Sequence, residues 1–326
     1  MKAIVIKEKR LVAEEVPMSA IKGDEVLIEV YAAGVNRADV LQVAGNYPPP
    51  IGAPDWCGLE VAGVIKKMTE EAKAKSGFSV GDKVCALLAG GGYAEFVSVP
   101  VGMVMPIPQG LSMEEAAALP EAFATAYLDL FIEGGAKAGD TLLMHAGASG
   151  LASVVIPLAK AFGLNVITTL RNATKKDKIK HLGADLIVDT GTESVAEVLA
   201  REEKQGRPVD IVIDCLGGAN MGDCLPYVAR GCRWIMIATL AGDVSSINLR
   251  TMYMKGIKLI GSTLRSRSVE MKTRILRELT ENVWERVAAR EIVPTLYKVL
   301  PLDEAEEAHA MMRRGDQVGK IVLKVK

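Results

Sequence analysis

Apolar and polar residues are patterned differently in the first third of the chain and in its middle. Before about residue 118, short apolar runs separated by glycine-rich turns predict strands, the clearest at 2–6, 25–32, 61–68 and 84–88. From residue 141 onward, apolar runs of strand length alternate with segments whose apolar residues recur at helical spacing. This alternation predicts a parallel sheet with helices on both faces.

The middle of the chain predicts a series of strands and helices. The strands fall at 141–145, 164–169, 185–189, 209–214, 233–239 and 257–261. The helices fall at 150–162, 174–182, 193–204 and 219–230. Ahead of them, residues 112–132 have a helical pattern. It begins with a capping box, Ser112 with Glu115, and Pro120 must end or kink it.

The last part of the chain predicts a long amphipathic helix over 268–290, a shorter helix over 302–313 and a final strand over 320–325. The final strand could rejoin the sheet formed by the first strands. We therefore predict an α/β protein with a β-rich domain made of residues 1–122 and 264–326. A doubly wound Rossmann domain, residues 123–263, is inserted between these two segments.

Composition limits the function classes. The 326 residues are 49% hydrophobic and 24% charged, with a net charge of −1, which suits a globular protein of two domains. The chain has no long basic run, so we expect no nucleic acid as its main partner. Its apolar runs are too short for a secretory signal or a membrane span. Five cysteines without a C-x-x-C pair predict reduced thiols and a cytoplasmic location.

The segment 141–163 predicts a dinucleotide site. A strand leads into the turn Gly147-Ala148-Ser149-Gly150-Leu151, and a helix follows. Small residues let the backbone approach a pyrophosphate, and the helix N-terminus offers N–H groups to its charge. The Ser149 hydroxyl could bind phosphate, cap the helix, or do both. An ordinary tight turn would look similar, and Pro157 should kink the helix.

The end of the second predicted strand indicates the type of cofactor. NAD-binding versions of this fold place a carboxylate there to hold the ribose 2′-hydroxyl. Residues 168–172 contain no carboxylate, whereas Arg171, Lys175 and Lys176 provide cations suited to a 2′-phosphate. We therefore predict NADPH as the cofactor. The alternative is a solvated basic start of a helix.

Two further strand ends should face the cofactor. Leu216 lies in the glycine-rich run 214–218, and Thr239 with Leu240 lies in the run 239–242. Asp214 could contact a ligand or cap its own turn, and Cys215 is better explained by packing than as a nucleophile.

The sequence contains no pattern that predicts a metal site. Its three histidines are His145, His181 and His309, and neither they nor the cysteines have metal-ligand spacing. His145 could line the cofactor cleft or be a buried strand residue.

Motifs spread over the whole chain occur together in one known family. They are Ala33-Gly34-Val35-Asn36-Arg37-Ala38-Asp39, Asn46-Tyr47-Pro48-Pro49-Pro50, Gly58-Leu59-Glu60-Val61-Ala62-Gly63, Gly81-Asp82-Lys83-Val84, the glycine turn and Gly319-Lys320-Ile321-Val322-Leu323. In this order they resemble the zinc-free quinone oxidoreductase branch of the medium-chain dehydrogenase/reductase superfamily. The runs 119–122, 214–218 and 264–267 look most like p53-inducible quinone oxidoreductases. The resemblance implies a GroES-like catalytic domain for the β-rich part.

The resemblance also bears on the metal. Zinc-dependent relatives have cysteine where Asn36 stands and Gly-His-Glu where Gly58-Leu59-Glu60 stands. Both ligand types are replaced here, which implies hydride transfer without a Lewis acid.

The resemblance assigns roles to individual residues. It places the catalytic candidates Asn36, Tyr47 and Tyr127 around the nicotinamide and the substrate. A turn residue and a packed ring are the alternatives for Asn36 and Tyr47. Arg265, with Leu264 before it and Arg267 after it, would close over the cofactor. The full set of cofactor-binding candidates is Thr125, Gly147, Ala148, Ser149, Gly150, Leu151, Arg171, Lys175, Leu216, Thr239, Leu240, Leu264 and Arg265.

These observations lead to one expected function and two alternatives. We expect a homodimeric NADPH-dependent quinone reductase with its cleft between the two domains. Hydride would pass from nicotinamide C4 to a small-molecule quinone beside Tyr47, and solvent would supply the proton, because no buried acid is evident. One alternative is reduction of the double bond of an enone or alkenal. The other is a non-enzymatic role, as an NADPH-binding structural protein or an RNA-binding protein. The near-neutral charge argues against RNA as the main partner.

Overall fold

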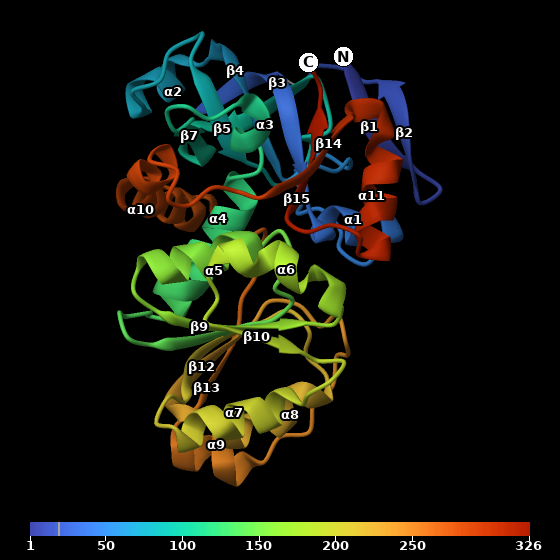
Figure 1. The fold of residues 1–326 in the computed structure, drawn as a ribbon. Coiled ribbons are helices and arrows are strands. Elements are labelled where there is room, and N and C mark those ends of the chain that lie inside the picture. Colours follow the sequence, from blue (N-terminus) through green and yellow to red (C-terminus); the bar gives the residue numbers. More distant parts are fainter. Residues whose placement is uncertain (19) are drawn as a thin grey trace. The chain divides into compact units, whose positions relative to one another are not determined.

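The computed structural model describes residues 1–18 and 20–326. It contains two compact units (Figure 1). Unit 1 consists of Met1–Ala124 and Leu264–Lys326, and unit 2 consists of Thr125–Thr263. Each unit is built around its own sheet, so each is described by itself.

Unit 1 contains a seven-stranded sheet in the order β14-β15-β3-β4-β5-β7, with β6 paired to β3. The strands are β3 (Glu25–Val35), β4 (Glu60–Met68), β5 (Lys83–Leu87), β6 (Phe96–Pro100), β7 (Val104–Pro106), β14 (Leu296–Pro301) and β15 (Lys320–Lys324). Strand β15 pairs antiparallel with β3, so the last strand joins the N-terminal sheet as the sequence predicts. Strands β1 (Lys2–Lys7) and β2 (Arg10–Glu15) form a separate antiparallel pair.

Six helices belong wholly or mostly to unit 1. They are α1 (Arg37–Ala44), α2 (Glu70–Lys75), α3 (Met113–Ala116), α4 (Pro120–Tyr127), α10 (Val269–Ala288) and α11 (Ala305–Arg314). Helix α10 confirms the predicted long amphipathic helix. The Ser268 side chain caps its N-terminus by accepting from the Met271 N–H at 3.2 Å, and Ile275 and Leu279 are fully buried on its inner face.

Unit 2 contains a six-stranded parallel sheet in the order β10-β9-β8-β11-β12-β13. The strands are β8 (Thr141–Met144), β9 (Asn165–Leu170), β10 (Leu186–Asp189), β11 (Val209–Asp214), β12 (Val228–Met236) and β13 (Lys258–Gly261). The order reverses between β8 and β11, which is the switch point of a Rossmann fold. The predicted α/β class, with its parallel doubly wound sheet, is confirmed.

Helices cover both faces of the unit 2 sheet. Figure 1 shows α5 (Ala152–Ala161) and α6 (Lys176–Ile179) on one face, and α7 (Val195–Lys204), α8 (Ala219–Cys224) and α9 (Leu249–Lys255) on the other. The core between the sheet and the second group is apolar and centres on the fully buried Trp234, with Leu143, Val212 and Leu199 in the same cluster. Helix α5 continues through Pro157 to Ala161.

Several predicted boundaries are wrong for identifiable reasons. Strand β12 begins at Val228, not at 233, because Gly231, with φ +77°, belongs to an irregular stretch that breaks the pattern of alternation. The preceding helix, predicted to reach 230, therefore ends at Cys224, and a single 3₁₀ turn follows. The helix predicted over 174–182 is a succession of three one-turn pieces.

The segment 112–132 is divided rather than continuous. Helix α3 ends at Ala116, and Pro120 starts α4, a position where the missing proline N–H has no intrahelical acceptor. A π-helix over Leu128–Glu133 follows. Helix α1 was not expected within the strand-rich part. Its signal is a capping box in which the Asn36 N–H donates to Asp39 Oδ2 at 2.8 Å.

A matched pair of substitutions in α10 tests how strongly burial stabilises unit 1. Val283 is fully buried and Val269, in the same helix, is 46% exposed. Val283→Ala removes two buried methyl groups and leaves a cavity, so we expect a loss of about 2 kcal/mol in the free energy of unfolding. Val269→Ala should stay within about 0.5 kcal/mol of the parent. Urea titration of both variants measures the difference, and equal losses would contradict the described packing.

Candidate functional site

The glycine turn after β8 is fixed to the neighbouring strand β9. The Gly147 N–H donates to the Thr169 carbonyl at 2.8 Å, and the Ala146 N–H donates to Thr169 Oγ1 at 3.2 Å. A side chain on Gly147 would collide with Thr168, whose Cγ2 would lie 3.0 Å from the new Cβ. The turn can therefore pack this closely against β9 only because residue 147 is glycine.

The start of α5 offers donors for an anion. Ser149 Oγ accepts from the Ala152 N–H at 3.1 Å, so this hydroxyl caps the helix, and its own O–H can still donate outward. Within the part of the chain that the structure describes, the N–H groups of Gly150 and Leu151 donate to no protein acceptor. Free N–H groups at a helix N-terminus are a phosphate-binding arrangement.

The predicted cations follow β9 directly. Arg171 is exposed at the first position after the strand, and Lys175 closes the 3₁₀ turn Ala173–Lys175. The Asn172 side chain caps that turn by accepting from the Thr174 N–H at 3.0 Å. Because β8 and β9 are parallel neighbours, Arg171 and the glycine turn lie at the same edge of the sheet.

The ends of β11 and β12 form a second pair of loops at this edge. The Gly218 N–H donates to the Gly242 carbonyl at 2.9 Å, and the Ala241 N–H donates to the Leu216 carbonyl at 2.7 Å. Leu240 is 52% exposed beside them. The structure thus brings the glycine turn, Arg171, Lys175, Leu216, Thr239 and Leu240 to the carboxyl edge of one parallel sheet.

The sequence left two possible roles for each of two residues at this edge, and the structure gives both residues a structural role. Asp214 is buried and accepts from the Leu216 and Gly217 N–H groups at 2.7 and 3.0 Å and from Trp234 Nε1 at 3.0 Å. It caps its own turn. His145, directly after β8, is fully buried with Nδ1 3.1 Å from Thr169 Oγ1, and burial lowers its pKa, which favours the neutral imidazole.

Asn36, a catalytic candidate in unit 1, is bound to a buried ion pair. Its Nδ2 donates to Glu60 Oε1 at 2.9 Å, and its Oδ1 accepts from Lys320 Nζ at 2.7 Å. Lys320 also pairs directly with Glu60. The side chains of Glu60 and Lys320 are 0% and 3% exposed, so strands β4 and β15 fix the orientation of this amide.

A second buried carboxyl lies one helical turn from Asn36. Asp39 accepts from the Gly58 N–H at 2.9 Å and from the Tyr93 hydroxyl at 3.3 Å. Burial raises its pKa to about 6. The Tyr93 hydroxyl is also 3.2 Å from His309 Nε2. The expectation that the chain has no buried acid is therefore wrong.

Tyr47 is held by Arg265. The guanidinium carbon lies 5.3 Å from the centroid of the tyrosine ring, a cation–π contact. Arg265 Nε donates to the Ala89 carbonyl and Nη2 donates to Gln42 Oε1, both at 2.8 Å. Arg265 is 5% exposed, so within unit 1 it orients Tyr47, and its predicted contact with a cofactor stays a prediction.

Glu121 was missed by the sequence analysis. It stands in the first turn of α4, and its N–H donates to Glu60 Oε2 at 2.9 Å. Burial, followed by the charge of Glu60, raises the pKa of the Glu121 carboxyl to about 8. The only sign of Glu121 in the sequence is its place in the run 119–122. That run does not show that Glu60 of β4 and Lys320 of β15 lie near its carboxyl group.

Thr125 and Tyr127 follow in the same helix and belong to unit 2. The Tyr127 ring is 7% exposed and lies 5.0 Å from the ring of Phe131. Leu264, the residue before Arg265, is 5% exposed in unit 1. The roles predicted for these three residues stay predictions.

Neither the cysteines nor a carboxylate cluster forms a metal centre in residues 1–18 and 20–326, where no group of three or more His, Cys, Asp and Glu side chains could hold an ion. All five cysteines are buried thiols. Burial raises the pKa of the Cys224 and Cys232 thiols to about 12. Of the helices that the structure describes, none is long and apolar enough to cross a membrane.

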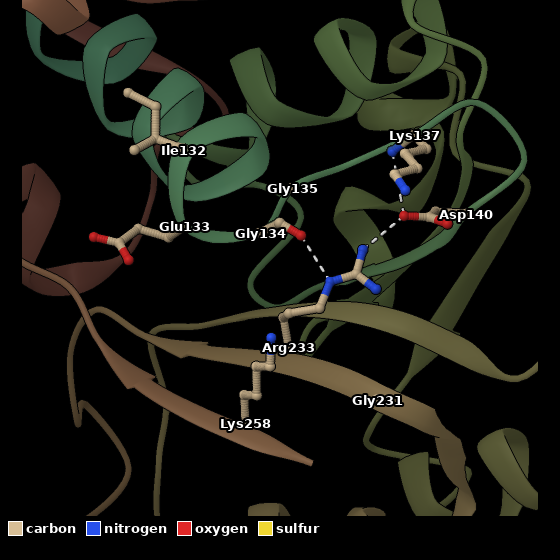
Figure 2. A pocket seen from close by; sticks show the side chains of 9 residues that line it. All are labelled: Ile132, Glu133, Gly134, Gly135, Lys137, Asp140, Gly231, Arg233 and Lys258. Carbon is tan, nitrogen blue, oxygen red and sulfur yellow. Dashed lines mark hydrogen bonds and ion pairs between the residues drawn. The ribbon is translucent and has the colours of Figure 1, made fainter. Parts of the chain in front are cut away.

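A cavity of about 410 Å³ lies at the amino edge of the unit 2 sheet, away from the predicted cofactor residues (Figure 2). Arg233 reaches across it, with Nε donating to the Gly134 carbonyl and Nη2 donating to Asp140 Oδ2, both at 2.7 Å. The Lys137 N–H donates to the same Asp140 oxygen at 3.2 Å. These contacts join β12 to the segment after the π-helix. The polar groups that line the cavity therefore have a structural role.

Comparison with known proteins assigns both units. Residues 22–109 match the family described as the alcohol dehydrogenase GroES-like domain, and residues 150–281 match the zinc-binding dehydrogenase family. The chain is 30% identical over 309 residues to a lovastatin diketide synthase from Aspergillus terreus, covering 93% of this chain and 12% of the synthase. It therefore spans about an eighth of that relative.

Other similarities extend over full lengths. The chain is 28% identical over 325 residues to the quinone oxidoreductase of Mus musculus, covering 98% of this chain and 93% of the relative. The quinone oxidoreductase of Thermus thermophilus, solved also as a complex with NADPH, superposes with a TM-score of 0.83 at 29% identity, covering 100% of both chains. The two family matches and these full-length similarities show that the chain belongs to the medium-chain dehydrogenase/reductase superfamily.

Proposed function

We propose that the protein is an NADPH-dependent quinone reductase that works without a metal ion. One observation carries the proposal. The glycine turn, with free N–H groups at Gly150 and Leu151, lies at the same sheet edge as the cation Arg171. The full-length similarity to quinone oxidoreductases supports the acceptor. Unit 2 would bind the dinucleotide and unit 1 would handle the acceptor.

The residues at the carboxyl edge of unit 2 fit a nicotinamide dinucleotide. Gly147 lets the turn pack directly on Thr168 of β9, and Ser149 can donate its O–H to a phosphate oxygen. Leu216 and Leu240 supply apolar surface beside it. When bound, the cofactor supplies a hydride from nicotinamide C4.

The choice of NADPH over NADH rests on charge. Arg171 and Lys175 follow β9, and no carboxylate stands at the end of that strand to hold a ribose 2′-hydroxyl. Guanidinium and ammonium groups instead suit a 2′-phosphate.

Independence from zinc rests on the available ligands. Both polar atoms of the Asn36 amide are hydrogen-bonded to the Glu60–Lys320 ion pair. Leu59 is fully buried, and its side chain has no atom that could ligate a metal ion. Without a Lewis acid, the acceptor has to be electron-poor, as a quinone is. In unit 1, Asn36 and Tyr47 would position the acceptor, with Tyr127 of unit 2 near the nicotinamide.

We also propose that the protein is a homodimer joined at the edge of the unit 2 sheet. Strand β13 ends the strand order, and its outer edge pairs with no other strand in the described residues. Apolar side chains are exposed next to it. They are Leu249 at 65%, Tyr253 at 63%, Met254 at 52% and Leu259 at 40%. An open edge with apolar neighbours is a template for pairing with a second copy.

Turnover of different acceptors tests the proposed reaction. We expect the purified protein to oxidise NADPH with an o-quinone or a p-quinone, faster than with an alkenal, and to keep this activity in a strong metal chelator. The reason is that hydride transfer to a quinone needs only positioning and exclusion of water. The fall in NADPH absorbance measures the rate with each acceptor and in the presence of the chelator. Inactivity with both quinones would refute the proposal, a preference for the alkenal would indicate a double-bond reductase, and NADPH binding without turnover would indicate a non-enzymatic role.

Substitution of the two cations tests the choice of cofactor. Arg171→Ala combined with Lys175→Ala removes the proposed partners of the 2′-phosphate, so NADPH binding should weaken by about 100-fold, as expected for lost charge-assisted hydrogen bonds. NADH binding should hardly change. Fluorescence titration of both dinucleotides gives the dissociation constants. Lys204→Ala, at an exposed lysine that ends α7, is the control for a general charge effect. Equal weakening of both dinucleotides would remove the assignment.

A lysine on the open edge tests the dimer. Sedimentation should give twice the 34.8 kDa of one chain for the parent protein. Leu259→Lys should shift it to the mass of one chain, because a charge on an edge strand opposes pairing. Val80→Lys, at a 57% exposed valine of unit 1, should leave the mass unchanged. A monomeric parent would contradict the proposal.

A further inference from the structure

Unit 1 contains a cluster of titratable side chains, of which the proposed hydride transfer uses only Tyr47. The cluster gathers around the start of α4 and draws on six other segments of the unit. Its members are Asp39 of α1, Tyr47 after α1, Glu60 of β4, Glu121 of α4, Arg265 before α10, Lys272 of α10 and Lys320 of β15. Titratable groups collected in a largely buried place are candidates for proton transfer.

Most groups of the cluster are already engaged. Glu60 accepts from Asn36, Lys320 and the Glu121 N–H. Asp39 accepts from the backbone N–H groups of Asn36 and Gly58. Arg265 donates to Ala89 and Gln42, and Lys272 Nζ donates to the Arg265 carbonyl at 3.4 Å. These groups hold one another in place, which leaves them little freedom to exchange a proton with a ligand.

Glu121 differs from the rest. Its backbone is anchored by the 2.9 Å hydrogen bond to Glu60, yet its carboxyl oxygens have no hydrogen-bond partner in residues 1–18 and 20–326. The residue is half-buried, so solvent can reach the carboxyl group. A carboxyl that is fixed at its base and free at its tip can deliver a proton and be reprotonated by water.

The surroundings of Glu121 favour the protonated form. Burial and the charges of Glu60 and Asp39 raise its pKa to about 8, against the opposing influence of Lys320 and Arg265. The N-terminal dipole of α4 also favours the carboxylate, so burial has to outweigh it. Burial raises the pKa of the Tyr47 hydroxyl and the charge of Glu121 adds to it, and the same charge opposes the lowering of the Lys272 pKa by burial. Glu121 therefore acts on the tyrosine that the proposed function places at the acceptor.

We infer that Glu121 is the general acid of the reaction and donates a proton to the acceptor lying against Tyr47. This inference rests on the proposed function. It replaces the expectation that the proton comes directly from solvent.

The step balances without any further reactant. The hydride carries two electrons and one hydrogen from nicotinamide C4 to the quinone, which becomes a hydroquinone monoanion. The Glu121 O–H bond breaks, its proton forms the second hydroxyl of the hydroquinone, and the carboxylate remains. Water then returns a proton to Glu121. For an enone, the same proton would quench the enolate formed by hydride addition to the β-carbon.

The pH dependence of turnover tests this role. The acid works in its protonated form, so kcat/KM of the parent should fall as pH rises through about 8. Glu121→Gln keeps the shape and the backbone anchor but cannot donate an acidic proton. We expect kcat/KM to fall by about 100-fold at pH 7 and the alkaline limb to disappear, with NADPH binding unchanged. Glu121→Asp, which restores a carboxyl, should recover the limb.

Two controls separate Glu121 from its neighbours. Glu114→Gln, at a glutamate of α3 paired only at 3.7 Å with Lys324, should keep the parent profile. Lys272→Met removes the other candidate donor and should keep the alkaline limb. If the limb survives in Glu121→Gln and disappears in Lys272→Met, lysine is the donor and our inference is wrong.

Titration of the carboxyl distinguishes failure of this inference from failure of the proposed function. The ¹³C resonance of the Glu121 carboxyl, assigned by its loss in Glu121→Gln, should titrate near 8 in the parent protein without any substrate. Titration at the ordinary glutamate value together with normal quinone turnover would overturn the acid role alone. Absence of turnover with quinone and alkenal would overturn the proposed function and the acid role together.

Discussion

The buried ion pair between Glu60 and Lys320 is the interaction on which unit 1 depends. The two residues are 260 positions apart in the chain, and their side chains are 0% and 3% exposed. Removing one partner from such a pair leaves an uncompensated buried charge and typically costs about 3–5 kcal/mol. The pair therefore couples strand β4 of the first segment to strand β15 of the last. It also fixes Asn36 through both atoms of its amide and the start of α4 through the Glu121 N–H.

Unit 2 depends on a constraint of the backbone. Parallel strands all end at one edge, and the strand order reverses between β8 and β11. The turn after β8 can lie against β9 because residue 147 has no side chain to meet Thr168. The candidate residues from four strand ends, distant in sequence, thereby meet at one edge. The geometry follows from strand direction and one glycine, so it tolerates wide variation in the other residues of these loops.

Local patterns predicted from the sequence agree with the structure wherever neighbouring residues determine the outcome. The apolar spacing of 268–290 identified α10, and the strand, glycine turn and helix at 141–163 identified β8 and α5. The prediction failed at β12, where Gly231 breaks the alternation, and at α1, whose eight residues have too weak an apolar periodicity to stand out among strands.

Interactions between distant segments could not be predicted. Asn36 alone gives no sign that its amide binds Glu60 and Lys320, and the sequence gives no sign that Arg265 contacts Gln42, Ala89 and Tyr47. Burial of a carboxyl is likewise a property of the packed unit. Glutamate is common on helices in this sequence, so nothing distinguishes Glu121 as an acid before its burial is known.

The contrast between Glu60 and Glu121 shows how one cluster can give two carboxyl groups different tasks. Glu60 accepts hydrogen bonds from three donors, one of them an ammonium group, and serves as a fixed negative charge. Burial, with that fixed charge second, opposes ionisation of Glu121, whose carboxyl oxygens accept from no donor in residues 1–18 and 20–326. Pairs of titratable groups whose environments differ in this way mark acid and base assignments in enzymes. Burial thus favours a proton on Glu121, and the Glu60 carboxylate adds to this effect while Lys320 opposes it.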